Sequence, residues 1–216
     1  MKRIGLAIVF AISLTTLFAC ATSGGGGPRL QDAQAYLDRG NGHFNEGNFN
    51  AAISDYTQAI RLDPKPFLYN NRGTAHRAMG NLDLALADFT EAIRLNPNYA
   101  NAYFSRGGAH AEGGNLDLAI ADYTEAIRIN PDDGEAYLNR GNAYFAEENF
   151  SLALEDFNNA IIRLDRSANA YNNRGVTLLR LGYIDVAIGD FEAALRIDPN
   201  HAGARDVLEK INSMEQ

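Results

Sequence analysis

Apolar and small residues recur along the chain in alternating helical patterns, and short polar breaks separate them. One pair of patterns runs from Asn101 to Glu112 and from Leu116 to Ile129, with Gly113-Gly114-Asn115 between them and Asn130-Pro131 after the second. Apolar positions at the helical period predict amphipathic helices, and Gly-Asn and Asn-Pro mark helix ends. The chain is therefore expected to fold as consecutive helix pairs.

The helix pair recurs five times with a period of 34 residues, or 33 in one case. Its marker is an Arg-Gly dipeptide, followed further along by an Asp and an aromatic residue. The arginines are Arg39, Arg72, Arg106, Arg140 and Arg174, and the acids are Asp55, Asp88, Asp122, Asp156 and Asp190. A fixed period in this range is typical of a solenoid, in which stacked units bury a shared core. Any function should therefore be sought on the surface that the stacked units present.

Aromatic, glycine and alanine residues occupy the expected interior of each pair. The first pattern carries Tyr36, Tyr69, Tyr103, Tyr137 and Tyr171, and the second carries Tyr56, Phe89, Tyr123, Phe157 and Phe191. Glycine inside a helix costs about 1 kcal/mol relative to alanine. The glycine after each marker arginine therefore predicts a close approach of the paired helix.

These aromatic, Gly, small-residue and Pro positions resemble the tetratricopeptide repeat. The resemblance covers about Ala33 to Ala202 and divides it into repeats at 33–66, 67–100, 101–134, 135–168 and 169–202. It implies an all-α fold, an α-solenoid in which five antiparallel helix pairs form a right-handed superhelix. Residues 203–216 are the expected capping helix and tail, with Val207, Leu208 and Ile211 on the apolar side of the cap.

Two units depart from the pattern. The stretch from Pro64 to Tyr69 is one residue shorter than that from Pro97 to Tyr103, which should tighten the first turn between repeats. In the fourth unit the stretch from Ile161 to Leu164 indicates an extra residue, and Asp165-Arg166 replaces the usual Asn-Pro. The second helix is expected to run on or to bulge there.

Residues 1–19 precede the repeats and have the pattern of a secretory signal. Lys2 and Arg3 stand before an uncharged apolar run from Ile4 to Ala19. The run is shorter than the roughly 20 residues that span a membrane, so an uncleaved anchor is the weaker alternative.

The segment Leu17-Phe18-Ala19-Cys20 resembles the lipobox of bacterial lipoproteins, although Phe18 is bulkier than the small residue usual there. The resemblance implies cleavage before Cys20, the only cysteine, and acylation of that residue. Ordinary secretion with cleavage after Ala21 is the alternative, because Ala19-Cys20-Ala21 fits the small-x-small pattern; it would give a soluble periplasmic protein.

Residues 20–32 would form the lipidated cysteine and a flexible tether, with four consecutive glycines at 24–27. In the lipoprotein family, Ala21 in place of an aspartate after the cysteine implies sorting to the outer membrane. The expected location is the bacterial cell envelope, lipid-anchored and facing the periplasm.

The charge of the chain excludes some partners. The net charge is -8, and it becomes -10 without the two basic residues of the first nineteen. An acidic domain argues against nucleic acid and against anionic headgroups as partners. The single cysteine allows no disulfide within the chain.

Motifs for chemistry are absent from the sequence. It contains no His-Glu-x-x-His, no phosphate loop and no Gly-x-Ser-x-Gly. We therefore expect no catalytic residue, no cofactor and no small-molecule substrate. His43, His76 and His110 share one repeat position, but equivalent helices about 10 Å apart cannot bring three nitrogens to the 2.0–2.1 Å that zinc requires. They are interpreted as packed histidines, with no metal.

The marker arginines are interpreted as structural partners of the repeated aspartates, in preference to ligand-binding residues. Exposed pairs of this kind contribute about 0–1 kcal/mol each, whereas half-buried bidentate pairs fix geometry.

The candidate binding surface is the concave face, which the first helix of each pair lines in the resembling family. The residues expected on it are Leu37, Asp38, Asn41, Asn70, Asn71, Thr74, Phe104, Ser105, Leu138, Asn139, Asn142, Phe145, Asn172 and Asn173. Asparagine amides can hydrogen-bond the backbone of an extended peptide without demanding a sequence. The alternative is that they only solvate, cap or turn the helices.

One class of partner is disfavoured. Certain chaperone-binding relatives grip a terminal carboxylate with lysine and arginine, and Leu37, Asn70 and Phe104 occupy positions where that clamp needs charge.

The leading hypothesis is a non-enzymatic envelope lipoprotein that holds a protein or peptide partner in the concave face. Similar lipoproteins assist pilus secretin assembly or gather cell-wall enzymes. The alternatives are a structural oligomer that self-associates through the convex face or the solenoid ends, and a soluble periplasmic adaptor.

Overall fold

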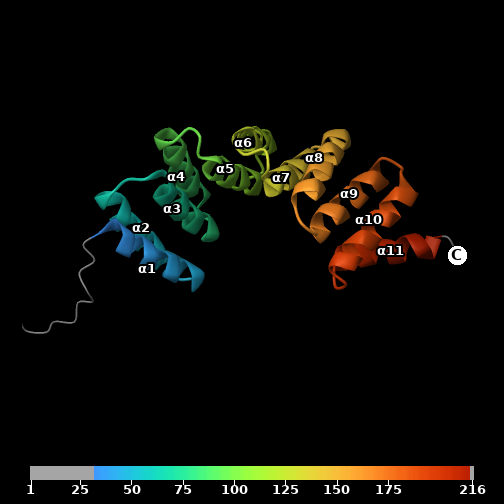
Figure 1. Ribbon diagram of the computed structural model, residues 1–216, viewed down its shortest axis with the longest axis horizontal. Helices are drawn as coiled ribbons and strands as arrows, with labels where there is room; N and C mark the ends of the chain where they lie inside the picture. Colours follow the sequence, from blue (N-terminus) through green and yellow to red (C-terminus); the bar gives the residue numbers. More distant parts are fainter. Residues whose placement is uncertain (1–31, 215–216) are drawn as a thin grey trace, which may run out of the picture. The chain divides into compact units, whose positions relative to one another are not determined.

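The computed structural model describes residues 32–214, and within this range the chain forms eleven α-helices and no strand (Figure 1). The helices are α1 (Ala33–Asn45), α2 (Phe49–Leu62), α3 (Pro66–Ala78), α4 (Leu82–Leu95), α5 (Ala100–Glu112), α6 (Leu116–Ile129), α7 (Gly134–Ala146), α8 (Phe150–Arg163), α9 (Ala168–Arg180), α10 (Ile184–Ile197) and α11 (Ala202–Met214). The expected all-α solenoid of five helix pairs and a cap is confirmed. The expected signal peptide, Cys20 and the Gly-rich tether lie outside the described residues.

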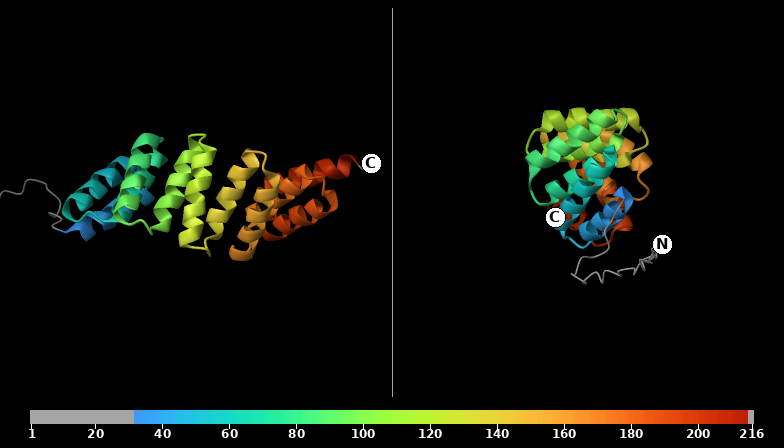
Figure 2. Two further views of the ribbon diagram at one scale, coloured as in Figure 1. Left: turned by 90° about the horizontal axis from the view of Figure 1, so that it is seen from above. Right: turned by 90° about the vertical axis from the view of Figure 1, so that its left-hand side faces the viewer.

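The helix pairs follow one another in chain order, as the left view of Figure 2 shows. The first helices α3, α5, α7 and α9 also contact each other in succession, while each second helix mainly contacts the first helices on either side of it. The first helices therefore approach one another more closely than the second helices do. We call the surface formed by the first helices the inner face, and that formed by the second helices the outer face. Among the described helices, none is both long and apolar enough to cross a membrane.

The two helices of a pair meet where the repeated spacing places an aromatic ring over a glycine. A Cβ atom on Gly73 would lie 2.7 Å from Cε1 of Phe89, and one on Gly141 would lie 2.8 Å from Cε1 of Phe157. The rings of Phe89 and Phe157 are buried. The predicted close approach is thus present, and it accounts for glycine at a helical position where alanine would otherwise be favoured.

The turn inside each pair requires a left-handed residue. In four of the five repeats this residue is a glycine: Gly47, Gly80, Gly114 and Gly182. In the remaining repeat, the fourth, it is Glu148, with φ of 59°. Glycine adopts positive φ without steric cost, whereas other L-residues do not. The fourth turn is therefore strained relative to the others.

The first irregularity is placed as predicted, and the second is not. The connection between α2 and α3 spans residues 63–65, one fewer than residues 96–99 between α4 and α5. In the fourth repeat, however, α8 has the same 14 residues as α6, so it neither runs on nor bulges. No residue is inserted, because Ile162 occupies the position that Arg128 has in α6.

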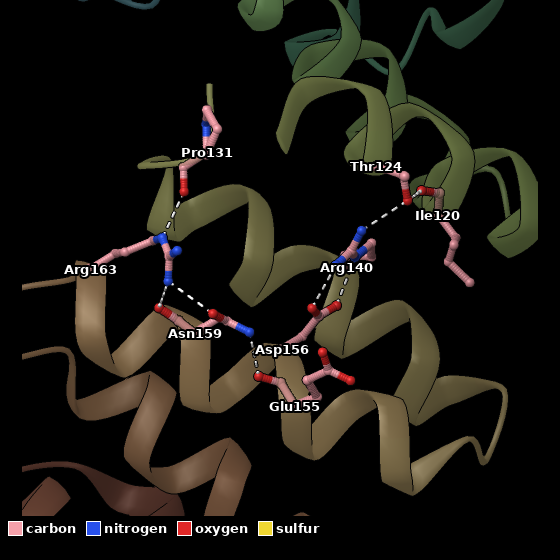
Figure 3. A network of polar contacts seen from close by, with 8 residues as sticks. All are labelled: Ile120, Thr124, Pro131, Arg140, Glu155, Asp156, Asn159 and Arg163. Atoms are coloured by element: carbon pink, nitrogen blue, oxygen red, sulfur yellow. Dashed lines mark hydrogen bonds and ion pairs between the residues drawn. The ribbon is translucent and has the colours of Figure 1, made fainter. Parts of the chain in front are cut away.

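The end of α8 is held by the preceding repeat, which explains why the helix stops in register. Arg163 donates Nε–H to the carbonyl oxygen of Pro131 at 2.6 Å (Figure 3). Leu164 lies against Gly134, where a Cβ would come within 2.6 Å of the leucine Cγ. These contacts replace the usual Asn-Pro stop.

The last helix covers the apolar end of the stack, as predicted. Val207, Leu208 and Ile211 of α11 pack with the cluster that contains Phe191 and Ala204. This helix contacts α10, the second helix of the last pair.

Candidate functional site

Each marker arginine forms a two-pronged ion pair with the aspartate of its own repeat. In the fourth repeat Arg140 donates Nε–H and Nη2–H to Oδ2 and Oδ1 of Asp156, at 2.8 and 2.7 Å (Figure 3). The other four pairs have the same pattern. The five aspartates are only 2–6% exposed. The hydrogen bond to the aspartate raises the pKa of Arg140 further above its usual range.

The same arginines also connect successive repeats. Arg140 donates Nη1–H to Oγ1 of Thr124 on α6 at 3.0 Å, and Arg106 makes the matching bond to Thr90 on α4. The guanidinium of Arg140 also lies over the ring of Tyr137, 5.7 Å from its centroid. The guanidinium is thus surrounded by aspartate, threonine and tyrosine side chains of the fold itself. This geometry supports the structural interpretation of the arginines.

The three repeated histidines lie beside the same aspartates, one in each of the first three repeats. Nε2 of His76 is 4.0 Å from Oδ2 of Asp88, and Nε2 of His110 is 3.8 Å from Oδ2 of Asp122. Burial lowers the pKa of both histidines, although the neighbouring aspartate acts in the opposite direction. Residues 32–214 contain no group of three or more His, Cys, Asp or Glu side chains that could hold a metal ion.

The inner face carries a pocket between the first two repeats, which we call the N-terminal pocket. Its lining residues are Asn41, Phe44, Tyr56, Asn71 and Thr74, and its volume is about 130 Å³. Oδ1 of Asn41 accepts hydrogen bonds from the Tyr56 hydroxyl at 2.9 Å and from Nδ2 of Asn71 at 3.4 Å. A hydrogen-bonded asparagine pair thus joins α1 to α3, and the aromatic rings of Phe44 and Tyr56 line the same pocket.

An equivalent pocket lies between the last two repeats, which we call the C-terminal pocket. Asn142, Phe145, Phe157, Asn173 and Val176 line it, and its volume is about 200 Å³. Oδ1 of Asn142 accepts a hydrogen bond from Nδ2 of Asn173 at 2.8 Å. Each residue stands at the same repeat position as its counterpart in the N-terminal pocket.

The middle of the inner face is built differently. Arg77 stands at the repeat position of Phe44 and Phe145; its Nη1–H donates to the carbonyl oxygen of Ser105 at 3.5 Å, and its Nε is 3.2 Å from a carboxylate oxygen of Glu112. A Cβ on Gly108 would come within 2.8 Å of Nη1 of Arg77. The arginine therefore lies across the place where the other two junctions have a pocket.

Several residues expected on the binding face have other surroundings. Asn70 and Leu138 are only 9% and 7% exposed, and Leu138 belongs to the core around Phe157. Nδ2 of Asn139 donates to the carbonyl oxygen of Glu135 in its own helix at 2.8 Å. Nδ2 of Asn172 donates to Oδ1 of Asn173 at 3.1 Å, so Asn172 contacts a residue of the C-terminal pocket without lining the pocket itself.

The remaining expected residues line neither of these two pockets. Leu37 packs in the core around Tyr56, Asp38 is exposed and accepts a hydrogen bond from Gln34, and the ring of Phe104 lies against that of Tyr123 with 5.8 Å between centroids. Ser105 offers its backbone carbonyl to Arg77. The structure thus brings Asn41, Asn71 and Thr74 together in one pocket, and Asn142, Phe145 and Asn173 in the other.

Sequence reasoning missed some of the lining residues. Phe44, Tyr56, Phe157 and Val176 complete the two pockets. The signal that could have found Phe44 is its repeat position, five residues after the marker arginine, because it is equivalent to Phe145. The repeat pattern predicts Tyr56 and Phe157 only as core residues, but each ring also lines a pocket.

Comparison with known proteins places these features in context. Models of the tetratricopeptide repeat match residues 33–66, 70–134 and 138–202. The crystal structure of MamA protein matches with 24% identity and a TM-score of 0.68, over 79% of this chain and 93% of MamA. YrrB, described as a TPR protein with an unusual peptide-binding site, matches with 22% identity and a TM-score of 0.67, over 82% of this chain and 92% of YrrB.

A third structure resembles part of the chain. The first TPR of Spaghetti (RPAP3), bound to the HSP90 peptide SRMEEVD, matches with 30% identity and a TM-score of 0.53, over 55% of this chain and 94% of that one. Among curated proteins no significant match to the sequence was found.

Proposed function

The chain belongs to the tetratricopeptide repeat family, and we propose that it is a non-enzymatic, lipid-anchored scaffold of the bacterial cell envelope. In this proposal the inner face holds an extended peptide segment of a protein partner. The partner is a protein, and neither a cofactor nor a small-molecule substrate takes part.

The observation that carries the proposal is the pair of asparagines that joins successive first helices in each pocket. In both pairs the internal hydrogen bonds use the Oδ1 atom of the first asparagine, Asn41 or Asn142. Its Nδ2 group therefore has N–H donors for a ligand, because an asparagine amide carries two of them. A backbone carbonyl of an extended peptide is the matching acceptor, and it is present in every sequence.

The surroundings of the asparagine pairs favour a peptide of ordinary composition. Phe44 and Tyr56 line one pocket, and Phe145 and Phe157 line the other, so each amide donor stands beside an apolar recess. Leu37, Asn70 and Phe104 hold the positions where a clamp for a terminal carboxylate would need charge. We therefore propose an internal peptide segment as the ligand, in preference to an acidic C-terminus.

Two similar proteins support peptide binding as the general activity of the fold. The Spaghetti domain has been solved with a bound peptide, and YrrB is described as having a peptide-binding site. Because an extended peptide is compatible with many partners, the family relationship supports the mode of binding and leaves the partner to be identified.

The decisive variant combines alanine at Asn41, Asn71, Asn142 and Asn173. The matched control is Asn139→Ala, because that side chain bonds to its own helix. Both variants should remain helical by circular dichroism, and only the four-asparagine variant should lose proteins that co-purify with the native chain from detergent-solubilised envelopes. If both variants retain the same partners, the asparagine pairs do not bind the partner.

The location in the envelope rests on the resemblance of residues 17–20 to a lipobox. Several acyl chains on Cys20 would hold the protein firmly, because each buried methylene contributes about 0.8 kcal/mol. Cells grown with radioactive palmitate should label the native chain and leave a Cys20→Ser variant unlabelled. Equal labelling of the two chains would contradict the lipid anchor, and release of both into the soluble periplasmic fraction would support the soluble adaptor.

Assistance to pilus secretin assembly and recruitment of cell-wall enzymes are the two processes that we propose for this scaffold. They differ in the partner that the inner face holds. Mass spectrometry of the proteins lost from the four-asparagine variant distinguishes them, because a secretin subunit supports the first and a cell-wall enzyme supports the second.

A structural, self-associating role is the second candidate, and exposed apolar residues on the outer face favour it. Leu84, Leu118, Leu152 and Val186 occupy one repeat position near the start of a second helix, and 39–57% of each residue is exposed. Contiguous exposed apolar surface marks interaction sites, whereas single residues do not. Light scattering of the purified chain tests this role: a monomer at all concentrations excludes it.

A further inference from the structure

The two pockets of the inner face have the size of single side chains. Their volumes of about 130 and 200 Å³ lie below the roughly 300–1,000 Å³ of small-molecule sites. A cavity of about 150 Å³ holds a molecule of the size of benzene. Each pocket is therefore suited to one side chain of a longer ligand, and not to a free small molecule.

The pockets differ in chemistry as well as in size. The smaller N-terminal pocket includes Thr74, whose hydroxyl donates to the carbonyl oxygen of Asn70 at 2.9 Å, and Tyr56, whose hydroxyl donates to Asn41. The larger C-terminal pocket has Val176 and Phe157 at the same two positions, so its walls are more apolar. The first pocket fits a small side chain such as threonine or valine. The second fits a large apolar one such as leucine or phenylalanine.

The distance between the pockets corresponds to three repeats, because Asn41 and Asn142 hold the same position in the first and fourth repeats. Packed helices lie about 8–10 Å apart, so three steps along the first helices cover on the order of 30 Å. An extended peptide advances about 3.3 Å per residue, so it would cover this distance in about nine residues.

Between the pockets the inner face offers no third equivalent recess at the junction of repeats two and three, among the described residues. Arg77 occupies that place, and its charge is balanced by Glu112. At the next junction Ala111 stands where the pockets have a phenylalanine. At these two junctions the phenylalanine that lines each pocket is absent, so a ligand that crosses them would not meet a recess of the same kind.

On the basis of the proposed function, we infer that the ligand is a two-anchor peptide: a small side chain and a large apolar side chain about nine residues apart, joined by a segment that is recognised through its backbone. The inference extends the proposed function, because a groove that binds any extended peptide has no preferred spacing.

The test is selection from a random 16-residue peptide display library on the full-length protein purified in detergent. Selected peptides should share a small and a large apolar residue about nine positions apart. Replacing either anchor by glycine should weaken binding at least tenfold, because burial of such a side chain contributes about 1.5–3 kcal/mol. Deleting three residues between the anchors should have an effect of similar size.

Variants of the protein assign each anchor to its pocket. Val176→Phe fills the C-terminal pocket and Thr74→Phe fills the N-terminal pocket, and circular dichroism verifies that both remain folded. A peptide without its large anchor should be indifferent to Val176→Phe and still be weakened by Thr74→Phe. If either variant fails to fold, Val176→Ala and Thr74→Ala enlarge the pockets instead, and the preferred anchor should become larger at the enlarged pocket only.

Three results would overturn the inference. In the first, the selected peptides have only one anchor, or have two anchors at no fixed spacing, and yet do not bind the four-asparagine variant. This result would leave the proposed function intact and refute the two-anchor ligand. Equal weakening of every peptide by both filled pockets would also refute it. If no peptide is enriched, or if the four-asparagine variant binds the selected peptides equally well, the proposed function fails together with the inference.

Discussion

Arg140 holds Asp156 through two parallel hydrogen bonds, from Nε at 2.8 Å and from Nη2 at 2.7 Å. The remaining nitrogen, Nη1, reaches Thr124 of the preceding repeat. A single guanidinium therefore connects the two helices of its own repeat and also links that repeat to its neighbour. Because this contact is repeated along the stack, it fixes the geometry of the inner face on which the pockets depend.

Removal of the buried carboxylate of Asp156 should lower the free energy of unfolding severely. Asp156→Ala leaves the Arg140 guanidinium without its partner, and breaking a buried pair in this way costs about 3–5 kcal/mol. Urea unfolding followed by circular dichroism measures the loss. The control is Glu125→Ala, because Glu125 pairs with the exposed Arg128 on the surface of α6. It should leave the unfolding midpoint unchanged, and equal shifts in the two variants would contradict a structural role specific to the buried pairs.

The glycine at the helix crossing should not tolerate a methyl group. In Gly73→Ala the new Cβ would lie 2.7 Å from the Phe89 ring, and overpacking of this kind costs about 1–3 kcal/mol. Gly42→Ala is the matched control in α1, since its Cβ would meet nothing within 4 Å. Helix propensity predicts that the control gains up to about 1 kcal/mol. Thermal unfolding distinguishes the two, and a gain in both would show that the ring can move aside.

The strained turn of the fourth repeat should be improved by glycine. A non-glycine residue in the left-handed conformation costs about 1–2 kcal/mol, and Glu148→Gly removes this cost. Part of the gain is offset, because glycine loses more conformational entropy on folding than other residues do. The expected net effect is a gain of up to about 1 kcal/mol, measured as a rise in the unfolding temperature. The reverse change in an equivalent turn, Gly114→Glu, should lower it.

Mild acid should weaken the first half of the stack. Burial lowers the pKa of His76 and His110 in the folded chain, whereas an unfolded histidine titrates near 6.5. Below that pH the unfolded chain binds more protons than the folded one, so stability is full above about pH 6.5 and falls until the lowered folded pKa is reached. Urea midpoints at pH 7.5 and 5.5 measure the loss. Replacing both histidines by phenylalanine should reduce this loss, and an unchanged difference between the two pH values would contradict the assignment.

The fold could be predicted because five copies of one pattern identify the residues that matter. The second helix of the third repeat has the predicted bounds, Leu116–Ile129, and the first begins one residue earlier than predicted, at Ala100. In the fourth repeat Ile162 replaces an arginine, which resembles an insertion in the sequence, and only the packing of Leu164 on Gly134 shows that the register is kept.

The binding face could be predicted only in part, because equal residues at equal positions can have different partners. Asn71 and Asn173 reach across to Asn41 and Asn142, while Asn139 bonds within its own helix. The residue opposite Asn139 in the preceding repeat is Gly108, which has no side-chain oxygen to accept a hydrogen bond. The informative pattern is thus a pair of positions in successive repeats, and a single repeat does not contain it.

The most direct test of the central claim is photo-crosslinking in living cells from defined positions of the full-length chain. A photoreactive phenylalanine analogue would replace Phe44 or Phe145, which line the two pockets and already carry a phenyl ring, and Leu84 or Leu118 on the outer face as controls. The predicted result is that a partner protein is captured from both pocket positions. This capture should be lost when the four pocket asparagines are changed to alanine. Capture from the outer positions alone would contradict peptide binding by the inner face.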